Sequence, residues 1–82
     1  MDTAAIEARV KKVVSEVLGV DEAKITSASR FVDDLGAESV QSLELVASFE
    51  DAFEIEMEED AALQVKTVGD AVAFIRKYVD AK

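Results

Sequence analysis

The chain has 82 residues, of which 50% are hydrophobic, and its 18 acidic against 9 basic residues give a net charge of −9. It contains no cysteine and no histidine, which excludes disulfides, thiolate metal sites and histidine as a general base. This excess of negative charge repels phosphate backbones, so we expect no binding to nucleic acid. Hydrophobic residues that recur at fixed spacings indicate one folded domain over residues 1–82 rather than a disordered chain.

The sequence carries no signal for insertion into a membrane. Its purely apolar runs are only a few residues long, too short to cross a bilayer, and no basic-then-apolar signal peptide opens the chain. We expect a cytoplasmic protein that is monomeric.

A strongly acidic stretch runs from Phe31 to Val65, with 11 carboxylates and no lysine or arginine. A field of this sign attracts basic protein surfaces, so we expect partners with basic patches. A solvated acidic surface that serves only solubility is the alternative that composition leaves open. The carboxylates are those of Asp33, Asp34, Glu38, Glu44, Glu50, Asp51, Glu54, Glu56, Glu58, Glu59 and Asp60.

The first predicted helix spans residues 3–18, where apolar residues form one stripe at helical spacing. Asp2 or Thr3 can cap its amino end, and Gly19 offers a left-handed residue that ends it. Residues 20–37 lack a sustained helical period and form a long connection, with short turns expected near residues 21–24 or 29–32. Its apolar residues would pin it to a core: Val20, Ile25, Phe31, Val32 and Leu35.

The second predicted helix begins at Ser39 or Val40 and ends at Phe53. At about 100° per residue, one apolar arc must face the core, and it comprises Leu45, Val46, Phe49, Ala52 and Phe53. Val40 and Ala47 point almost the opposite way. Carboxylates border them, namely those of Glu44, Glu50, Asp51 and Glu54. An outward strip of small apolar residues between carboxylates favours a partner-docking face over a purely solvated one.

Two further helices complete the predicted fold. A short one is expected at about residues 59–64. The segment Thr67-Val68-Gly69-Asp70 fits a Thr-x-x-Asp variant of the capping box and opens a last helix that ends at residue 78 or 79. Three main helices, a short third one and a long first connection predict a small all-α four-helix bundle.

The residues alone offer little chemistry. The stretch from Asp33 to Glu44 has the length of a calcium-binding loop, but Glu38 stands where that loop requires glycine, so we expect no metal site. Ser39 has no histidine to activate it as a nucleophile, and the second glycine of a nucleophile elbow is missing, so we expect no catalytic residue. By position alone, Ser39 is a candidate cap of the second helix.

Six segments, spread over nearly the whole chain, carry a family resemblance: Ile6-Glu7-Ala8-Arg9-Val10-Lys11-Lys12-Val13, Leu18-Gly19-Val20, Phe31-Val32-Asp33-Asp34-Leu35-Gly36-Ala37-Glu38-Ser39-Val40, Leu43-Glu44-Leu45-Val46, Phe49-Glu50-Asp51-Ala52-Phe53 and Thr67-Val68-Gly69-Asp70-Ala71. They closely resemble the acyl carrier proteins. In that family the serine of an Asp-Ser-Leu motif carries 4′-phosphopantetheine on a four-helix fold.

The resemblance implies that Ser39 is the attachment site of a covalent 4′-phosphopantetheine, which a separate transferase takes from coenzyme A with the help of a magnesium ion. The thiol of the group would hold an acyl chain as a thioester for basic-surfaced enzymes of fatty-acid, lipid or polyketide-type biosynthesis. The chain itself would not be an enzyme.

The resemblance also implies two sets of binding residues. An apolar interior between helices would shelter the acyl chain, with the residues Leu45, Val46, Phe49, Ala62, Val65 and Ile75. Positions that face partners in the family match Glu38, Val40, Gln41, Glu44, Ala47, Glu50, Asp51, Met57 and Glu59.

Departures from the family pattern indicate a specialised carrier rather than the housekeeping one of fatty-acid synthesis. Glu38 replaces the usual Asp, Val40 the usual Leu, and Gln41 a frequent Asp. Ala47 is smaller than the usual Met and weakens an apolar anchor for partners. Phe49 would fill volume that a long acyl chain needs, which favours a shorter or unusual acyl group.

Two alternatives remain from the sequence. A peptidyl or aminoacyl carrier would use the same attachment chemistry, although the acidic second helix favours an acyl carrier. A small acidic interaction protein that is never modified would share the composition and the docking face.

Overall fold

The computed structural model describes residues 2–80, and these form four α-helices and one 3₁₀ turn. The elements are α1 (Thr3–Leu18), η1 (Glu22–Lys24), α2 (Ser39–Phe53), α3 (Glu59–Leu63) and α4 (Val68–Asp80). Between residues 2 and 80, strand-like pairing is limited to an isolated antiparallel bridge between Arg30 and Thr67. The predicted all-α fold with a short third helix is confirmed.

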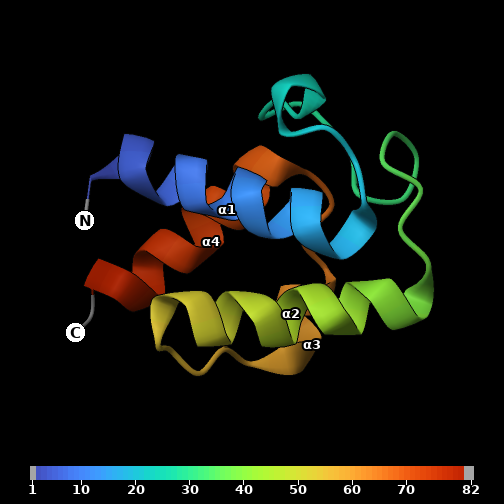
Figure 1. Ribbon diagram of the computed structural model, residues 1–82. Coiled ribbons are helices and arrows are strands. Elements are labelled where there is room, and N and C mark those ends of the chain that lie inside the picture. The colour runs from blue at the N-terminus through green and yellow to red at the C-terminus, as the bar shows by residue number, and fades with distance from the viewer. Residues whose placement is uncertain (1, 81–82) are drawn as a thin grey trace.

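Helix α1 packs against both α2 and α4, and the short α3 packs against α2. Helices α1 and α2 run in opposite directions, and the long connection between them lies at one end of the molecule (Figure 1). Both chain termini lie at the other end. The amino end of α2, which begins with Ser39, therefore lies beside the long connection and far from the termini.

The core draws on the apolar stripes that the sequence predicts. Five side chains are completely shielded from solvent or nearly so: Ile6, Val10, Val14, Val68 and Ile75. In α2 the predicted core arc contributes three buried residues, Leu45, Phe49 and Phe53. Because α1 supplies three of the best-buried side chains, it forms the centre against which α2 and α4 are placed.

The helix boundaries follow local capping signals. The Asp2 carboxylate accepts the Ala5 N–H at 2.9 Å at the start of α1, and Gly19 ends that helix with a φ of 68°. At the start of α4 the Thr67 hydroxyl accepts the Asp70 N–H at 3.1 Å. Helix α4 runs to Asp80, slightly beyond its predicted end.

The long connection is pinned to the core as predicted, with one exception. Ile25 and Phe31 are buried, whereas the Val32 side chain is 61% exposed. The reason is a tight turn: the N–H groups of Asp34 and Leu35 both donate to the Arg30 carbonyl at 3.0 Å. The turn directs Phe31 inward and leaves its neighbour Val32 outward.

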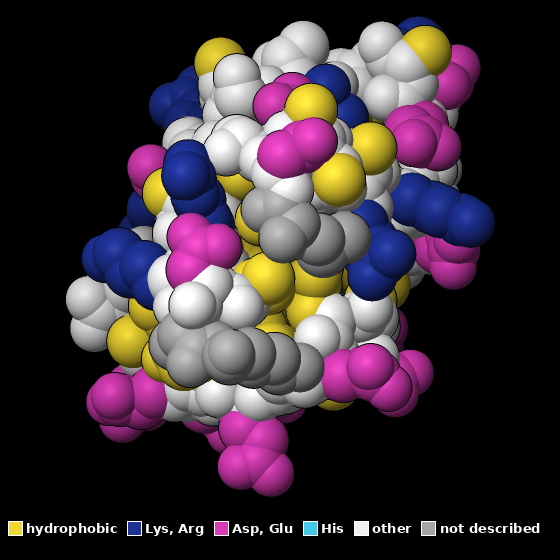
Figure 2. Space-filling view, turned by 90° about the vertical axis from the view of Figure 1, so that its left-hand side faces the viewer, with side chains coloured by type: hydrophobic (Ala, Val, Ile, Leu, Met, Phe, Trp, Pro, Cys, Tyr) yellow, Lys and Arg dark blue, Asp and Glu magenta, His cyan; other side chains and the backbone are white. Residues whose placement is uncertain are grey.

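Charge is divided between the two halves of the molecule. Helices α1 and α4 carry lysine and arginine, whereas α2 and α3 carry none. At the end that holds both termini, side chains of both signs surround a hydrophobic patch (Figure 2). The unbalanced negative charge therefore belongs to α2, α3 and the segments beside them.

Candidate functional site

Ser39 projects from a well-fixed turn. It is the first residue of α2, and it is exposed. Gly36, with a φ of 71°, adopts the left-handed conformation that glycine tolerates best. The next residue, Ala37, is buried, and its N–H donates to the Phe31 carbonyl at 2.8 Å. The backbone is thus anchored two residues before the serine, which places its hydroxyl at a defined position.

Glu38, and not Ser39, is the cap residue of α2. The Gln41 side-chain oxygen accepts the Glu38 N–H at 3.0 Å, which is the returning bond of a capping box. The Ser39 hydroxyl forms no hydrogen bond with any of residues 2–80. The interpretation of Ser39 as a helix cap is therefore wrong, and its hydroxyl is available for another use.

The carboxylates that precede Ser39 are partly neutralised by Arg30. Its guanidinium lies 3.4 Å from the Asp33 carboxylate and 3.3 Å from that of Asp34. The hydrogen bond from the Arg30 backbone N–H, reinforced by the guanidinium, lowers the pKa of Asp34. The bond to Asp34 in turn raises the pKa of Arg30. Glu38 is left as the carboxylate next to Ser39 in sequence.

The outward face of α2 carries the predicted mixture of apolar and acidic residues. Val40 is 65% exposed, and Glu44, Ala47 and Asp51 are exposed as well. Leu43, which is 47% exposed, adds an apolar side chain that the sequence analysis did not assign to this face. The same helical geometry could have found it, since residue 43 lies one turn before residue 47. We refer to these five residues as the α2 outer strip.

Other expected partner-facing residues are engaged within the fold. Met57 was expected to face partners, but its side chain is only 9% exposed and belongs to the core. The Glu50 carboxylate accepts the Met57 N–H at 2.8 Å and so ties the segment after α2 back to that helix. Gln41 is occupied by the Glu38 N–H, whereas Glu59 is exposed in the first turn of α3. The structure does not bring Met57 to the α2 outer strip.

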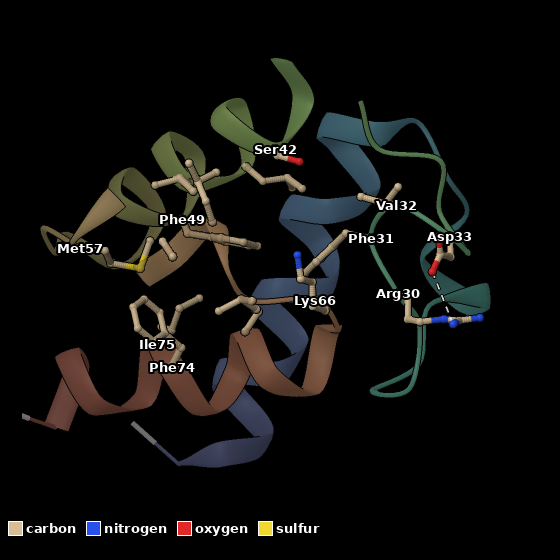
Figure 3. A pocket seen from close by; sticks show the side chains of 16 residues that line it. Arg30, Phe31, Val32, Asp33, Ser42, Phe49, Met57, Lys66, Phe74 and Ile75 are labelled. Atoms are coloured by element: carbon tan, nitrogen blue, oxygen red, sulfur yellow. Dashed lines mark ion pairs between the residues drawn. The ribbon is translucent and has the colours of Figure 1, made fainter. Parts of the chain in front are cut away.

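A cavity of about 240 Å³ lies among α2, α3, α4 and the connection that precedes α2. All six residues expected to shelter an acyl chain line this cavity (Figure 3), and they are Leu45, Val46, Phe49, Ala62, Val65 and Ile75. Met57 and Phe74 add to its apolar wall. Phe49 forms one side of the cavity and does not close it. Because these residues come from distant parts of the chain, only the fold brings them together.

Metal ligands and membrane segments are two further features that bear on function. Among residues 2–80 no group of three or more Asp or Glu side chains is arranged to hold a metal ion. No helix in the described part of the chain is long and apolar enough to cross a membrane.

Comparison with known proteins shows which family this chain belongs to. The family described as "phosphopantetheine attachment site" matches residues 8–75. The chain belongs to this family of phosphopantetheine-binding carriers. A solved structure of a candidate acyl carrier protein from Mycobacterium tuberculosis is similar to this chain, with a TM-score of 0.81 and 30% sequence identity. The similarity covers 88% of this chain and 96% of that one.

Carriers of this family hold a covalent 4′-phosphopantetheine group and are not catalytic. The predicted recognition, the prosthetic group and the non-enzymatic character are thereby confirmed. The residues of this chain fit the group. An exposed serine hydroxyl without a hydrogen bond stands at the amino end of a helix, where unpaired N–H groups and the helix dipole favour a phosphate.

Proposed function

We propose that this carrier protein holds acyl groups as thioesters on a 4′-phosphopantetheine attached to Ser39, over a single domain of residues 1–82. The observation that carries the proposal is the Ser39 hydroxyl, exposed at the first position of α2 while Glu38 and Gln41 form the cap. When bound, the group supplies a flexible arm that ends in a thiol. The chain supplies the attachment point, a docking face and an acyl shelter.

The cavity supports an acyl cargo rather than an aminoacyl or peptidyl one. Its wall is mostly apolar, and its volume is about 240 Å³. An engineered apolar cavity of about 150 Å³ accepts benzene, so this cavity has room for on the order of eight carbons. We therefore propose medium-length acyl groups, whose burial is favoured by about 0.8 kcal/mol per CH₂.

The α2 outer strip supports docking of enzymes with basic surfaces. Exposed carboxylates attract such surfaces, and the exposed Val40 and Leu43 offer apolar contact close to Ser39. We propose that a phosphopantetheinyl transferase and acyl-processing enzymes share this face. We also propose contacts beside the strip, at Glu38, Gln41, Glu50 and Glu59.

Within this proposal the protein works as a cytoplasmic monomer in fatty-acid, lipid or polyketide-type biosynthesis. Tethering the acyl group raises its effective concentration at whichever enzyme is docked, without a new active site in the carrier.

Intact mass spectrometry tests the proposal. The apo protein is incubated with coenzyme A, magnesium and a broad-specificity transferase. We expect a gain of one phosphopantetheine in the wild type and no gain in Ser39→Ala. The variant Ser42→Ala, altered at the next serine along α2, is the matched control and should gain the same mass as the wild type. An unmodified wild type would favour the alternative of an acidic interaction protein.

A further inference from the structure

Four polar residues interrupt the apolar wall of the cavity: Arg30, Asp33, Ser42 and Lys66. Two of them, Arg30 and Asp33, form an ion pair with each other. The Arg30 guanidinium turns away from the cavity toward Asp33, 3.4 Å away, and it also lies 3.3 Å from Asp34 (Figure 3). The polar groups that remain for a ligand are the Lys66 ammonium and the Ser42 hydroxyl.

Lys66 is a cation that lines the cavity. It forms no ion pair within residues 2–80, although the chain has 18 acidic residues. Figure 3 shows its ammonium on the cavity side of the α3–α4 connection. Its backbone is held in place, because the Lys66 carbonyl accepts the Phe31 N–H at 3.0 Å and the next residue forms the bridge with Arg30.

Ser42 is a polar residue on the core face of α2. It lies among the residues of the predicted apolar arc, one turn before Val46, and it is half-buried. Its hydroxyl forms no hydrogen bond with any of residues 2–80. The Ser42 hydroxyl lies at the wall of a mostly apolar cavity and has no partner within residues 2–80, so it can donate a hydrogen bond to a ligand oxygen.

We propose that the cavity receives acyl groups that bear a carboxylate, with the Lys66 ammonium as the counter-ion and the Ser42 hydroxyl as a hydrogen-bond donor. The inference rests on the proposed carrier function. Ser39 does not line the cavity, so the phosphate attached to it is not the anion that Lys66 meets there. In this proposal the anion belongs to the cargo.

The charge of Lys66 would favour acyl groups with a carboxylate over uncharged ones. The acidic surroundings disfavour a carboxylate everywhere else on this half of the molecule. Lys66 is exposed, so the attraction is screened by water and is that of a surface ion pair, worth about a five-fold change in binding. Without Lys66 the carboxylate would lie beside the apolar wall without a counter-ion, which is unfavourable.

The test compares acyl groups of equal length in wild-type and Lys66→Met protein. One pair is suberyl and octanoyl, and the other is malonyl and propionyl, each loaded from its coenzyme A thioester. The readouts are the rate of thioester cleavage by hydroxylamine, divided by the rate for the same free coenzyme A thioester, and the melting temperature of each loaded form. We expect Lys66→Met to cut the protection of a carboxylate-bearing group about five-fold and to leave its methyl-ended partner protected.

Matched variants separate charge from shape. Lys66→Arg keeps the charge and should retain the protection. Lys12→Met removes an exposed lysine of α1 that does not line the cavity, and it should change nothing. Ser42→Ala should weaken protection of the carboxylate-bearing groups only. A selective loss of protection of the suberyl group in Lys66→Met would place the bound carboxylate far from the thioester. A selective loss for the malonyl group would place it close by. Either result supports the inference.

Two results would contradict different claims. Failure of the wild type to gain phosphopantetheine would contradict the carrier function itself. The inference about carboxylates would be overturned if the protein loads normally but Lys66→Met lowers the thioester protection of both acyl groups in each pair equally, or of neither. The carrier function would then remain intact.

Discussion

At the residue scale, the chemistry of Ser39 depends on two neighbours. In a serine that caps a helix, the hydroxyl oxygen accepts a hydrogen bond from a backbone N–H. Here Glu38 occupies the cap position, and the neutral Gln41 side chain bonds its N–H at 3.0 Å. Because Gln41 is neutral, it adds no negative charge beside the phosphate that we propose on Ser39. Glu38 and Gln41 therefore act together beside the proposed attachment site.

We expect Gln41→Ala to destabilise the protein because it removes the acceptor for the Glu38 N–H. Loss of a capping interaction costs about 1 kcal/mol, which corresponds to a fall of about 4–8 °C in the melting temperature of a domain of this size. Calorimetry measures the change. Gln41→Glu, which retains an acceptor, should lose less. Equal melting temperatures for Gln41→Ala and the wild type would show that the bond contributes nothing.

At the element scale, the proposed function assigns a different role to each face of α2. Its inner arc lines the core and the cavity, while the α2 outer strip presents carboxylates and apolar side chains to solvent. Because the two faces share no side chain, docking can be altered without unfolding the domain.

We expect the double variant Glu44→Lys with Asp51→Lys to slow transferase loading by about ten-fold at low salt, since exposed charges act mainly on the association rate. A time course of mass gain measures this. The control, Glu7→Lys with Glu22→Lys, makes the same change in net charge on the α1 side of the molecule. Equal slowing in both double variants would mean that total charge matters and the α2 outer strip does not.

Helix boundaries could be predicted because their signals are local. Asp2, Gly19 and Thr67 each act within a few residues, so their capping roles follow from the sequence. Val32 and Met57 were placed less well because their orientation depends on contacts outside their own helical period. A turn closed on Arg30 exposes Val32, and the bond to Glu50 draws Met57 inward.

At the scale of the whole molecule, the carboxylates of the acidic half repel one another and lower the stability of the fold. Eleven carboxylates and no lysine or arginine lie between Phe31 and Val65, and Asp33 and Asp34 among them pair with Arg30. We expect the melting temperature to rise by several degrees between about 0.01 M and 1 M salt, because the Debye length falls from about 30 Å to about 3 Å. Magnesium should act at lower concentration. A melting temperature insensitive to both would show that the repulsion is small.

The cavity shows what whole-molecule geometry adds to the sequence. Six of its apolar lining residues could be predicted, because helical spacing gives the inner face of each helix and the family resemblance gives the shelter between helices. Lys66 and Ser42 could not be assigned to it, since a connection residue and a polar residue have no periodic signal that points inward. Only the packing of α2, α3 and α4 around one space brings these two residues to the same cavity.

The central claim is that Ser39 carries the prosthetic group, and localisation of the modification tests it most directly. Protein loaded by the transferase is cleaved by protease, and the modified peptide is fragmented in a tandem mass spectrometer. We predict that the phosphopantetheine mass lies on Ser39 in the peptide that spans residues 31–66, which has no internal lysine or arginine for trypsin to cleave before residue 66. Modification at Ser42, at Ser48 or at any other residue would contradict the account.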